Sequence, residues 1–441
     1  MTNKKEFLKE VILWTSLFVV FVLAPLFVAV IGHQEAYRGF WIEFGVALGF
    51  IGIAMMGLQF VLTARFKNVA APIGTDSLLN FHRQAGYVAY FFILGHVIVL
   101  ITADSEFLYF FDPGVNAPRA VALVSALIML TMLVVFTIWR EKLRIPYEWW
   151  RLSHGLFAFL IIFIGLSHML MVGFYISELW QQVLWIFLVG FAMLLLIHIR
   201  VINPYKLSKK PYKTTGVWQE AKKTWTLEIE PDNHSGFDFL AGQFAWLTIG
   251  ESPFSINQHP FSFSSSADVK GRYQFTIKEL GDFTSSIKSI EAGTPIYMEG
   301  PYGAFTLNPE PREAFFVIGG IGITPVISML RTLKDRNDNR KMTLIYGNPD
   351  TESIAFREEL KELEQKLNFN VVHVVENPPD DWTGYEGFIT EEILKTYIPE
   401  DVTGTDFYVC GPEPMMDMAE MTLRDWQVPV FKLKSERFNI V

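Results

Sequence analysis

The sequence predicts a multi-domain membrane protein, in which a six-helix transmembrane bundle precedes an antiparallel β-barrel and an α/β domain with a parallel sheet. Three observations predict this fold class. Six apolar runs fill the first 200 residues, and each is long enough for the roughly 20 residues that cross a bilayer. Short alternating strands follow to about residue 310, after which strands alternate with helices. We therefore place the domains at residues 1–203, 211–310 and 311–441.

Composition changes between the two halves of the chain. With 441 residues, 51% hydrophobic and 19% charged, the chain is too apolar for an ordinary soluble enzyme and too charged to lie wholly in a membrane. Residues 1–200 hold 13 Lys and Arg against 11 Asp and Glu, whereas residues 201–441 hold 24 against 35. The net charge therefore changes from +2 to −11 at the basic connector RVINPYKLSKKPYK. Cys410 is the only cysteine, which excludes an intrachain disulfide and a thiolate metal cluster.

The six apolar runs define the expected membrane topology. They lie near residues 11–31, 41–62, 78–101, 120–139, 150–172 and 180–197. One side of the membrane collects the basic residues Lys4, Lys5, Lys9, Arg65, Lys67, Arg140, Lys142, Arg144, Arg200, Lys206, Lys209 and Lys210, and the other side has Arg38 and Arg119. By the positive-inside rule, both termini and the domains after residue 203 are cytoplasmic. The first run is longer than the apolar part of a signal peptide, so we treat it as a retained helix.

Two of the apolar runs carry a histidine at each end with the same spacing. HRQAGYVAYFFILGH runs from His82 to His96, and HGLFAFLIIFIGLSH runs from His154 to His168. Fourteen residues rise about 21 Å in about 3.9 helical turns, so both rings of each run lie near one face. The two helices run in the same direction, which places His82 opposite His154 near the cytoplasm and His96 opposite His168 near the outside. Facing imidazoles can hold two b-type haems, one near each side of the bilayer.

Two other interpretations of the histidines stay open. Single histidines often hydrogen-bond between packed membrane helices, and a row of them can relay protons in a transporter. Because helix packing gives no reason for two identical spacings, the repeat favours the haem interpretation.

The order of strands and helices divides the soluble half into two domains. Strands at 225–230, 244–250, 273–280 and 295–300 have the length and alternation of an antiparallel barrel. From residue 314 the strands AFFVIGG, KMTLIYG, FNVVHVVE and DFYVCG each precede a helical segment, which predicts a doubly wound parallel sheet. A last strand, VFKLKSERF, follows the fourth helix.

The barrel carries residues suited to a flavin. In HPFSFSSS, Pro260 and Phe261 offer a flat apolar contact, and Ser262 and Ser264 offer hydroxyl donors. Lys278 can meet a pyrophosphate, and the turn at GDFT leads into a short helix whose N–H groups favour phosphate. Serine-rich strand ends are common, so this motif alone is a weak signal.

The α/β domain has a glycine-rich turn after its first strand. In VIGGIGITPVISML, Gly319, Gly320 and Gly322 precede a helix that begins with Thr324 and Pro325. Glycines let a backbone approach phosphate, although the pattern is not GxGxxG and also suits a plain strand–helix turn. Cys410 closes the last strand before a helix, at the sheet edge where such folds bind ligands.

Taken in order, HPFSFSS, GDFT, GPYG, GGIGITP and CGPEPMM resemble the ferredoxin-NADP reductase superfamily. Together with the two paired-histidine helices, they resemble the NADPH oxidase and ferric reductase family, including bacterial NADPH oxidase homologues. The resemblance implies a ferric reductase-like haem domain at 1–203, an FAD-binding barrel at 211–310 and an NAD(P)H-binding domain at 311–441. It also implies that the protein lies in a bacterial-type plasma membrane.

The resemblance assigns site residues by position. The haem ligands it implies are His82, His96, His154 and His168. The FAD contacts it implies are His259, Pro260, Phe261, Ser262, Ser264, Ile277, Lys278, Phe283, Thr284 and Phe438. The nucleotide contacts it implies are Gly319, Gly320, Gly322, Thr324, Pro325, Cys410, Gly411 and Pro412. Cys410 and Phe438 are expected beside the reacting rings, although in this family the aromatic residue ends the chain and here Asn439, Ile440 and Val441 follow Phe438.

The expected function is transmembrane electron transfer from cytosolic NAD(P)H, through FAD and two b-type haems, to an outer acceptor. We expect dioxygen as the acceptor, which makes the protein a superoxide-forming NAD(P)H oxidase. The alternatives are a ferric-chelate reductase and a haem module that feeds a partner protein. We expect no nucleic acid and no obligatory protein partner.

The sequence gives only weak signals for the outer electron acceptor and for the choice between NADH and NADPH. Animal oxidases of the family carry a histidine one turn beyond the outer ligand, where this chain has Leu100. A ferric chelate would want a docking surface, for which the outer loop offers Asp104, Glu106 and Asp112. After the second parallel strand, YGNPDTES has no cation until Arg357, which predicts use of NADH as well as NADPH.

Overall fold

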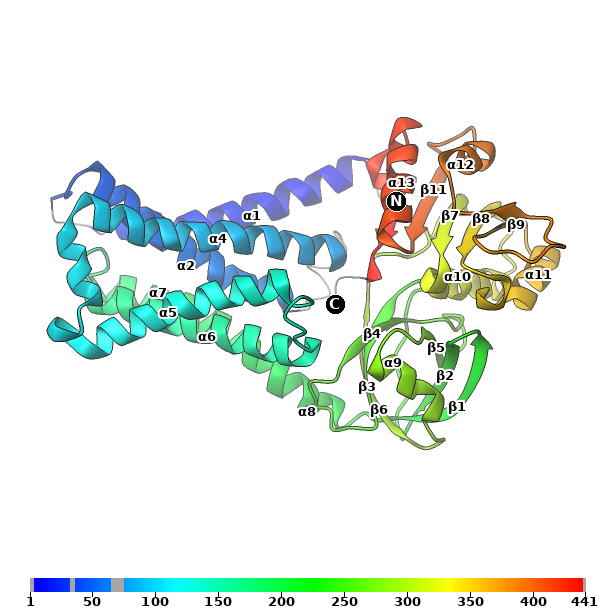
Figure 1. Ribbon diagram of the computed structural model, residues 1–441, viewed down its shortest axis with the longest axis horizontal. Coiled ribbons are helices and arrows are strands. Elements are labelled where there is room, and N and C mark those ends of the chain that lie inside the picture. Colours follow the sequence, from blue (N-terminus) through cyan, green and yellow to red (C-terminus); the bar gives the residue numbers. More distant parts are fainter. Residues whose placement is uncertain (1–3, 32–35, 65–74, 439–441) are drawn as a thin grey trace. The chain divides into compact units, whose positions relative to one another are not determined.

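The computed structural model describes residues 4–31, 36–64 and 75–438 (Figure 1). Arg65 and Lys67, used above for orientation, and Asn439, Ile440 and Val441 lie outside these residues. The chain divides into two compact units, one made mainly of residues 9–203 and the other mainly of Pro204–Val441. Each unit is described by itself.

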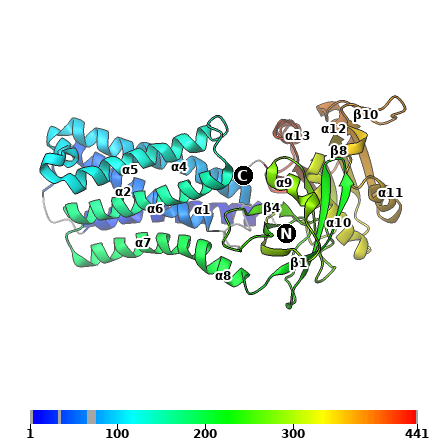
Figure 2. The same ribbon diagram turned by 60° about the horizontal axis from the view of Figure 1, so that its bottom comes forward.

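The first unit contains six helices long and apolar enough to span a membrane. They are α1 (Lys4–Ile31), α2 (Phe40–Thr63), α4 (Thr75–Ala103), α5 (Pro113–Trp139), α6 (Tyr147–Val172) and α7 (Leu179–Ile197). They run side by side in both views (Figures 1 and 2). A π-helical turn, His198–Ile202, and the short helix α8 (Asn203–Leu207) continue α7. The predicted six-helix bundle is confirmed.

Capping and small residues shape this bundle. Asp112 accepts a hydrogen bond from the Gly114 N–H at 2.7 Å, so α5 begins earlier than its apolar run. A Cβ at Gly52 would lie 2.8 Å from Ile93, and a Cβ at Gly165 would lie 2.7 Å from Ile53. Glycine at these positions therefore lets α2 approach both α4 and α6 closely.

The second unit begins with a six-stranded antiparallel sheet. Its strands are β1 (Tyr212–Ala221), β2 (Thr224–Pro231), β3 (Phe244–Ile249), β4 (His259–Ser262), β5 (Tyr273–Lys278) and β6 (Pro295–Tyr302), in the order β4-β3-β6-β1-β2-β5. Phe263, which follows β4, pairs with Phe275 of β5, so the two edges of the sheet meet there. Phe263 and Phe275 are fully buried in the barrel core. The predicted antiparallel fold is confirmed. HPFSFSSS lies at a strand end as expected, in β4, and β1 is a strand that we had not placed.

A parallel sheet completes the second unit. Its strands are β7 (Glu313–Gly319), β8 (Met342–Asn348), β9 (Phe369–Val375), β10 (Tyr385–Glu386), β11 (Thr405–Cys410) and β12 (Leu433–Glu436), in the order β10-β9-β8-β7-β11-β12. The last strand is shorter than predicted, because Val430–Lys432 forms a 3₁₀ turn.

Helices cover both faces of this sheet (Figure 1). Alternate residues of β7 point to opposite sides, with Phe316 in one apolar cluster and Phe315 in the other. Helices α10 (Ile323–Asp335) and α11 (Arg357–Lys366) pack on the first side. Helices α12 (Glu391–Tyr397) and α13 (Glu413–Asp425) pack on the second. This arrangement confirms the predicted doubly wound fold.

Candidate functional site

His82 on α4 and His154 on α6 lie opposite one another inside the helix bundle. Their ring centroids are 6.2 Å apart, and the ring planes meet at 51°. Thr137 Oγ1 lies 3.4 Å from Nδ1 of His154 and donates its own hydrogen to the Leu133 carbonyl at 2.7 Å. A hydroxyl has one hydrogen, so Thr137 accepts from His154, whose Nδ1 then carries the proton. The Nε2 of His154 keeps a lone pair, as a metal ligand must.

His96, fourteen residues beyond His82, is held by the backbone of α2. Its Nδ1 lies 2.8 Å from the Gly45 carbonyl, which only accepts, so Nδ1 carries the proton and Nε2 has the lone pair. A Cβ at Gly49 would lie 2.6 Å from the same Nδ1, so the ring packs directly on the helix backbone. We did not predict a role for either glycine, although small residues four apart are a sequence signal for close helix packing.

His168, the fourth histidine, has an aromatic neighbour. The Phe110 ring meets it edge-on, with centroids 5.7 Å apart. The Arg119 guanidinium lies 4.4 Å from the Phe110 centroid and donates to the Tyr109 carbonyl at 2.9 Å. The Phe110 ring therefore lies between the Arg119 guanidinium and the His168 ring.

The separation of His82 and His154 suits a haem iron. An imidazole nitrogen lies about 2 Å from a bound metal and about 1.1 Å from its own ring centroid, so two coordinated imidazoles have centroids roughly 6 Å apart. The separation of 6.2 Å between His82 and His154 fits this value. Within the described ranges, no group of three or more His, Cys, Asp and Glu side chains could hold a metal ion. A haem iron would need only two histidine ligands from the protein, because a porphyrin supplies the remaining ligand atoms.

The predicted flavin residues gather at the edge of the barrel. The His259 ring lies 4.0 Å from the Phe283 ring of α9 (Asp282–Ser286), and Phe261 is nearly parallel to Phe283 at 6.2 Å. Thr284 Oγ1 accepts from the N–H groups of Leu280 and Gly281 at 2.8 and 3.0 Å, which fixes the turn after β5. Pro260 lies on the edge strand β4, where its missing N–H leaves no gap in the sheet.

Not all of these residues reach that edge. The Ser264 side chain is fully buried and accepts a hydrogen bond from Thr276 at 3.0 Å. Ile277 belongs to the barrel core, and Ser262 is also buried. Lys278 ends β5 and is half-buried. The structure therefore groups His259, Phe261 and Phe283 and places Ser264 and Ile277 in the interior.

The predicted nucleotide loops touch at the carboxyl edge of the parallel sheet. β7 lies between β8 and β11, and the helices after β7 and β11 pack on opposite faces, which makes this a topological switch point. A Cβ at Gly322 would lie 2.5 Å from the Cys410 carbonyl oxygen, and one at Gly411 would lie 2.8 Å from the Gly319 nitrogen. Both contacts require glycine. Gly320 has φ of 53° and open space around its Cα, a cradle that a ligand can approach.

The helices after these loops start with the predicted residues. Thr324 is buried, and its hydroxyl donates to the Ile321 carbonyl at 3.0 Å. Pro325 lies in the first turn of α10, and Pro412 precedes the first residue of α13.

Cys410 is fully buried at the end of β11, in register with Glu436 of β12. We did not predict Glu436 as a site residue, because only the parallel pairing of the last strand places its carboxylate at this edge. Phe438, two residues later, is 39% exposed. Arg437 pairs with Asp417 of α13 at 2.7 Å, which ties the segment before Phe438 to the helix after CGPEPMM.

The loop after β8 is acidic and pairs with a lysine from the barrel. Lys222, in the turn between β1 and β2, lies 3.3 Å from Asp350 and 3.1 Å from Glu352. The structure thus pairs this cation with carboxylates of the loop in which a 2′-phosphate would need positive charge.

Three protein families match successive parts of the chain. Residues 48–165 match the ferric reductase like transmembrane component, residues 219–306 an FAD-binding domain, and residues 316–421 the oxidoreductase NAD-binding domain. The chain has the domain architecture of the NADPH oxidase and ferric reductase family. The ferric reductase-like helix bundle and the FAD- and NAD-binding unit follow the order predicted from the sequence.

Individual relatives each match a part of the chain. NADH-cytochrome b5 reductase 2 of Phaeosphaeria nodorum is 35% identical over 194 residues, which are 42% of this chain and 57% of the relative. NADH-cytochrome b5 reductase 1 of Debaryomyces hansenii is 35% identical over 158 residues, 34% of this chain and 56% of the relative. The chain thus spans little more than half the length of these curated relatives. The FAD/NAD-binding domain of nitric oxide dioxygenase from Vibrio cholerae is 17% identical with a TM-score of 0.47, over 52% of this chain and 98% of that chain.

Proposed function

We propose that the protein is an NAD(P)H oxidase that transfers electrons from cytoplasmic NAD(P)H, through FAD and two b-type haems, to dioxygen on the outer side of the membrane. The product of one-electron transfer to dioxygen is superoxide. The observation that carries this proposal is the His82–His154 pair at 6.2 Å, on two helices that each repeat a histidine fourteen residues further along.

The proposal divides the work between the cofactors and the chain. When bound, FAD accepts a hydride and releases single electrons, and the haems carry single electrons across the bilayer. The chain holds and orients these groups and keeps water away. Thr137 and the Gly45 carbonyl hold the Nδ1 protons of His154 and His96, which directs both Nε2 atoms to ligand positions.

In the second unit, the soluble one, the chain lets its backbone approach the nucleotide closely. The glycines of the loops after β7 and β11 let main-chain N–H groups face a nucleotide, and Cys410 and Glu436 lie in register at the same edge. His259, Phe261 and Phe283 offer flat surfaces for the flavin. The role of Phe438 as a cover for the flavin ring stays a prediction.

The first experiment asks whether the protein contains haem. We expect the reduced-minus-oxidised absorption spectrum of the purified protein to have the bands of a low-spin b-type haem. We also expect two haems for each flavin. A protein that binds FAD and shows no haem bands would contradict the proposal and favour a proton-relay role for the histidines.

The second experiment identifies the acceptor. We expect NADPH-driven reduction of cytochrome c in air to be abolished by superoxide dismutase. Reduction of a ferric chelate under nitrogen should then be slow by comparison. Activity that resists the dismutase, together with fast anaerobic iron reduction, would identify a ferric reductase instead.

A further inference from the structure

Helix α10 contacts the barrel through polar side chains on one face. Ser328 donates to the Ser265 carbonyl at 2.6 Å, and Thr332 Oγ1 accepts from the Ala267 N–H at 2.9 Å. Arg331 donates to the Ser264 carbonyl at 2.7 Å. Arg331 and Thr332 lie three and four positions after Ser328 and so share a face of the helix with it. Their partners all belong to residues 264–267, the segment directly after the flavin strand β4.

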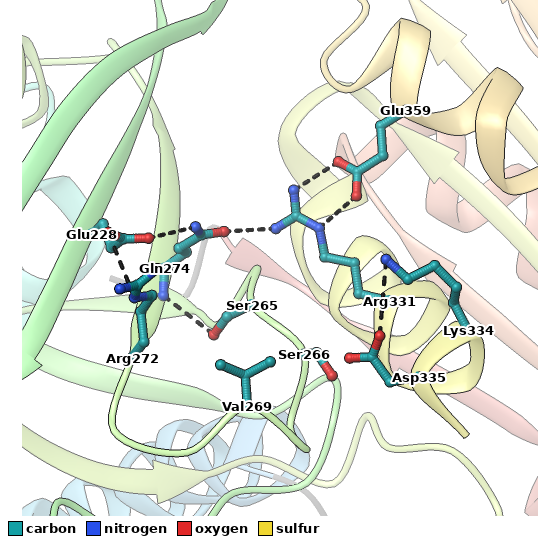
Figure 3. Close-up of a pocket in the computed structure, with 10 residues that line it drawn as sticks. All are labelled: Glu228, Ser265, Ser266, Val269, Arg272, Gln274, Arg331, Lys334, Asp335 and Glu359. Carbon is teal, nitrogen blue, oxygen red and sulfur yellow. Dashed lines mark hydrogen bonds and ion pairs between the residues drawn. The ribbon is translucent and has the colours of Figure 1, made fainter. Parts of the chain in front are cut away.

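Arg331 is the centre of this contact (Figure 3). Its Nη1 also donates to Gln274 Oε1 of β5 at 2.8 Å, while Nε and Nη2 each donate to Glu359 of α11 at 2.7 Å. The guanidinium carbon lies 5.1 Å from the Phe356 ring centroid. One side chain therefore joins two helices of the nucleotide domain to strand β5 and to the segment after β4 of the flavin barrel.

The surroundings of Arg331 strengthen these bonds. The side chain is 17% exposed and borders a polar cavity of about 340 Å³ that Arg272 and Glu228 also line. Burial raises the pKa of the Glu220 carboxyl, an effect that the nearby positive charge of Arg331 opposes. Charge-assisted bonds in such partly buried places are stronger than those at an open surface.

The chain paths from Arg331 to both predicted cofactor sites are short. On the barrel side, Ser264 is two residues from Ser262 of the flavin strand. On the nucleotide side, α10 leads back from Arg331 to its first residue, Ile323, directly after the glycine loop. A shift of α10 against the barrel would therefore change the distance between the two sites.

We propose that Arg331 is a positioning residue for hydride transfer, because its guanidinium fixes the helix that follows the nucleotide loop against the strand that carries the flavin. In this reaction the C4–H bond of the reduced nicotinamide breaks, and the hydrogen moves with both bonding electrons to the flavin. The nicotinamide is oxidised and the flavin is reduced. The inference rests on the proposed function only for this first step.

Arginine suits this position better than lysine does. The planar guanidinium donates two N–H groups to Glu359, while Nη1 donates in the opposite direction, to Ser264 and Gln274. A lysine ammonium is a single point of charge and cannot span both sets of acceptors. We therefore expect Arg331→Lys to restore only part of the function lost in Arg331→Met.

The test measures the first hydride transfer from NADH to the flavin under nitrogen in the full-length, FAD-loaded protein, so the outer acceptor plays no part and the step precedes any electron transfer to haem. Misplacement of reacting groups by about 1 Å can slow a reaction by about 100-fold. We expect Arg331→Met to lower the limiting rate per bound flavin roughly 10- to 100-fold. The apparent Kd for NADH should change less than about threefold, because the glycine loops stay intact.

A second readout does not depend on turnover. Hydrogen exchange of residues 264–268 should be faster in Arg331→Met than in the wild type, with or without FAD. The matched control is Arg272→Met. Arg272 lines the same cavity, but its ion pair with Glu230 lies within the barrel. The control should keep the wild-type rate and exchange within about twofold.

The proposal is overturned if Arg331→Met keeps the wild-type limiting rate per bound flavin and loses only flavin content or thermal stability. If this variant does not fold, Gln274→Met removes a single acceptor on the barrel side and should still slow flavin reduction about three- to tenfold. An unchanged rate in Gln274→Met would then overturn the proposal. Failure of the haem or superoxide experiments would leave these measurements unaffected.

Discussion

The helix bundle and the soluble unit build their candidate sites from different parts of the chain. In the bundle, the groups that face one another are side chains, with His82 and His154 at 6.2 Å. In the second unit, main-chain atoms approach one another closely at the glycines after β7 and β11. A helix repeats its faces at a fixed interval, so side chains on two helices can be aligned by spacing alone. A loop has no such interval, so its atoms are placed by the sheet that carries it.

This difference determines what a single substitution does. Removing an imidazole deletes a ligand and leaves the helix in place. Adding a methyl group to a buried loop glycine leaves every functional atom present and moves the backbone that carries them. The predictions below test this distinction.

The largest effect is expected for the histidines. His168→Leu should lower the haem content from two per flavin to one and stop electron flow to the outer acceptor, while NADH still reduces the flavin. The paired substitution His96→Leu should have the same result, because each haem has its own two ligands. Absorption spectra with flavin quantification provide the count, and an unchanged count in both variants would contradict the pairing.

A loop glycine should come next. In Gly322→Ala, the new Cβ would lie 2.5 Å from the Cys410 carbonyl oxygen, so the two loops must move apart. Overpacking of this kind costs about 1–3 kcal/mol of stability, and we expect NADH to bind roughly 10- to 100-fold more weakly. Titration of the flavin absorbance with NADH measures the affinity.

Gly387→Ala, in the same domain and outside the predicted nucleotide loops, is the control for this variant. A Cβ there meets no atom within 4 Å, and its cost is the left-handed φ of 92°, about 1–2 kcal/mol. Equal losses of affinity in the two variants would show that the contact with Cys410 is not what limits the loop.

Gly49 tests whether the backbone also matters in the bundle. A Cβ in Gly49→Ala would lie 2.6 Å from Nδ1 of His96, which should push the ring away from the Gly45 carbonyl. Loss of such a supporting contact weakens metal binding about 10- to 100-fold, so we expect partial loss of the outer haem. Gly57→Ala on the same helix meets no atom within 4 Å and should keep both haems. Full haem content in both variants would show that α2 does not support His96.

The smallest effect is expected for nucleotide choice. Lys222 is engaged by Asp350 and Glu352, so kcat/KM for NADH and NADPH should agree within about tenfold. Asp350→Ser should free part of this positive charge and raise the preference for NADPH a few-fold. A wild-type preference of several hundredfold for NADPH would be inconsistent with this account.

The sequence predicted the parts of the molecule that depend on repetition. The apolar runs, the two histidine spacings and the alternation of strands and helices each repeat a local pattern, and the structure contains all six helices and both sheets. Thr137, Gly45 and Gly49 escaped prediction because they contact histidines on other helices. Glu436 escaped for a similar reason, since only the pairing of β12 with β11 sets it beside Cys410.

The short final strand shows a second limit. The apolar pattern VFKLKSERF suggested a strand from residue 430, but Pro429 precedes a 3₁₀ turn over Val430–Lys432. Proline favours the start of such a turn more strongly than the following apolar residues favour a strand. Local turn chemistry therefore decided the boundary.

The tautomers of His96 and His154 have an electrical consequence. Each Nδ1 proton is held by a protein acceptor, the Gly45 carbonyl or Thr137, and each Nε2 is committed to a ligand position in the proposed path. Neither ring has a free site at which to load and release a proton, so the two histidines cannot return positive charge alongside the electrons. In the proposed path these two rings carry no compensating proton, so each electron that crosses by way of them moves one charge, worth about 2.3 kcal/mol for every 100 mV of membrane potential. We therefore expect the proposed electron transfer to depend on the membrane potential.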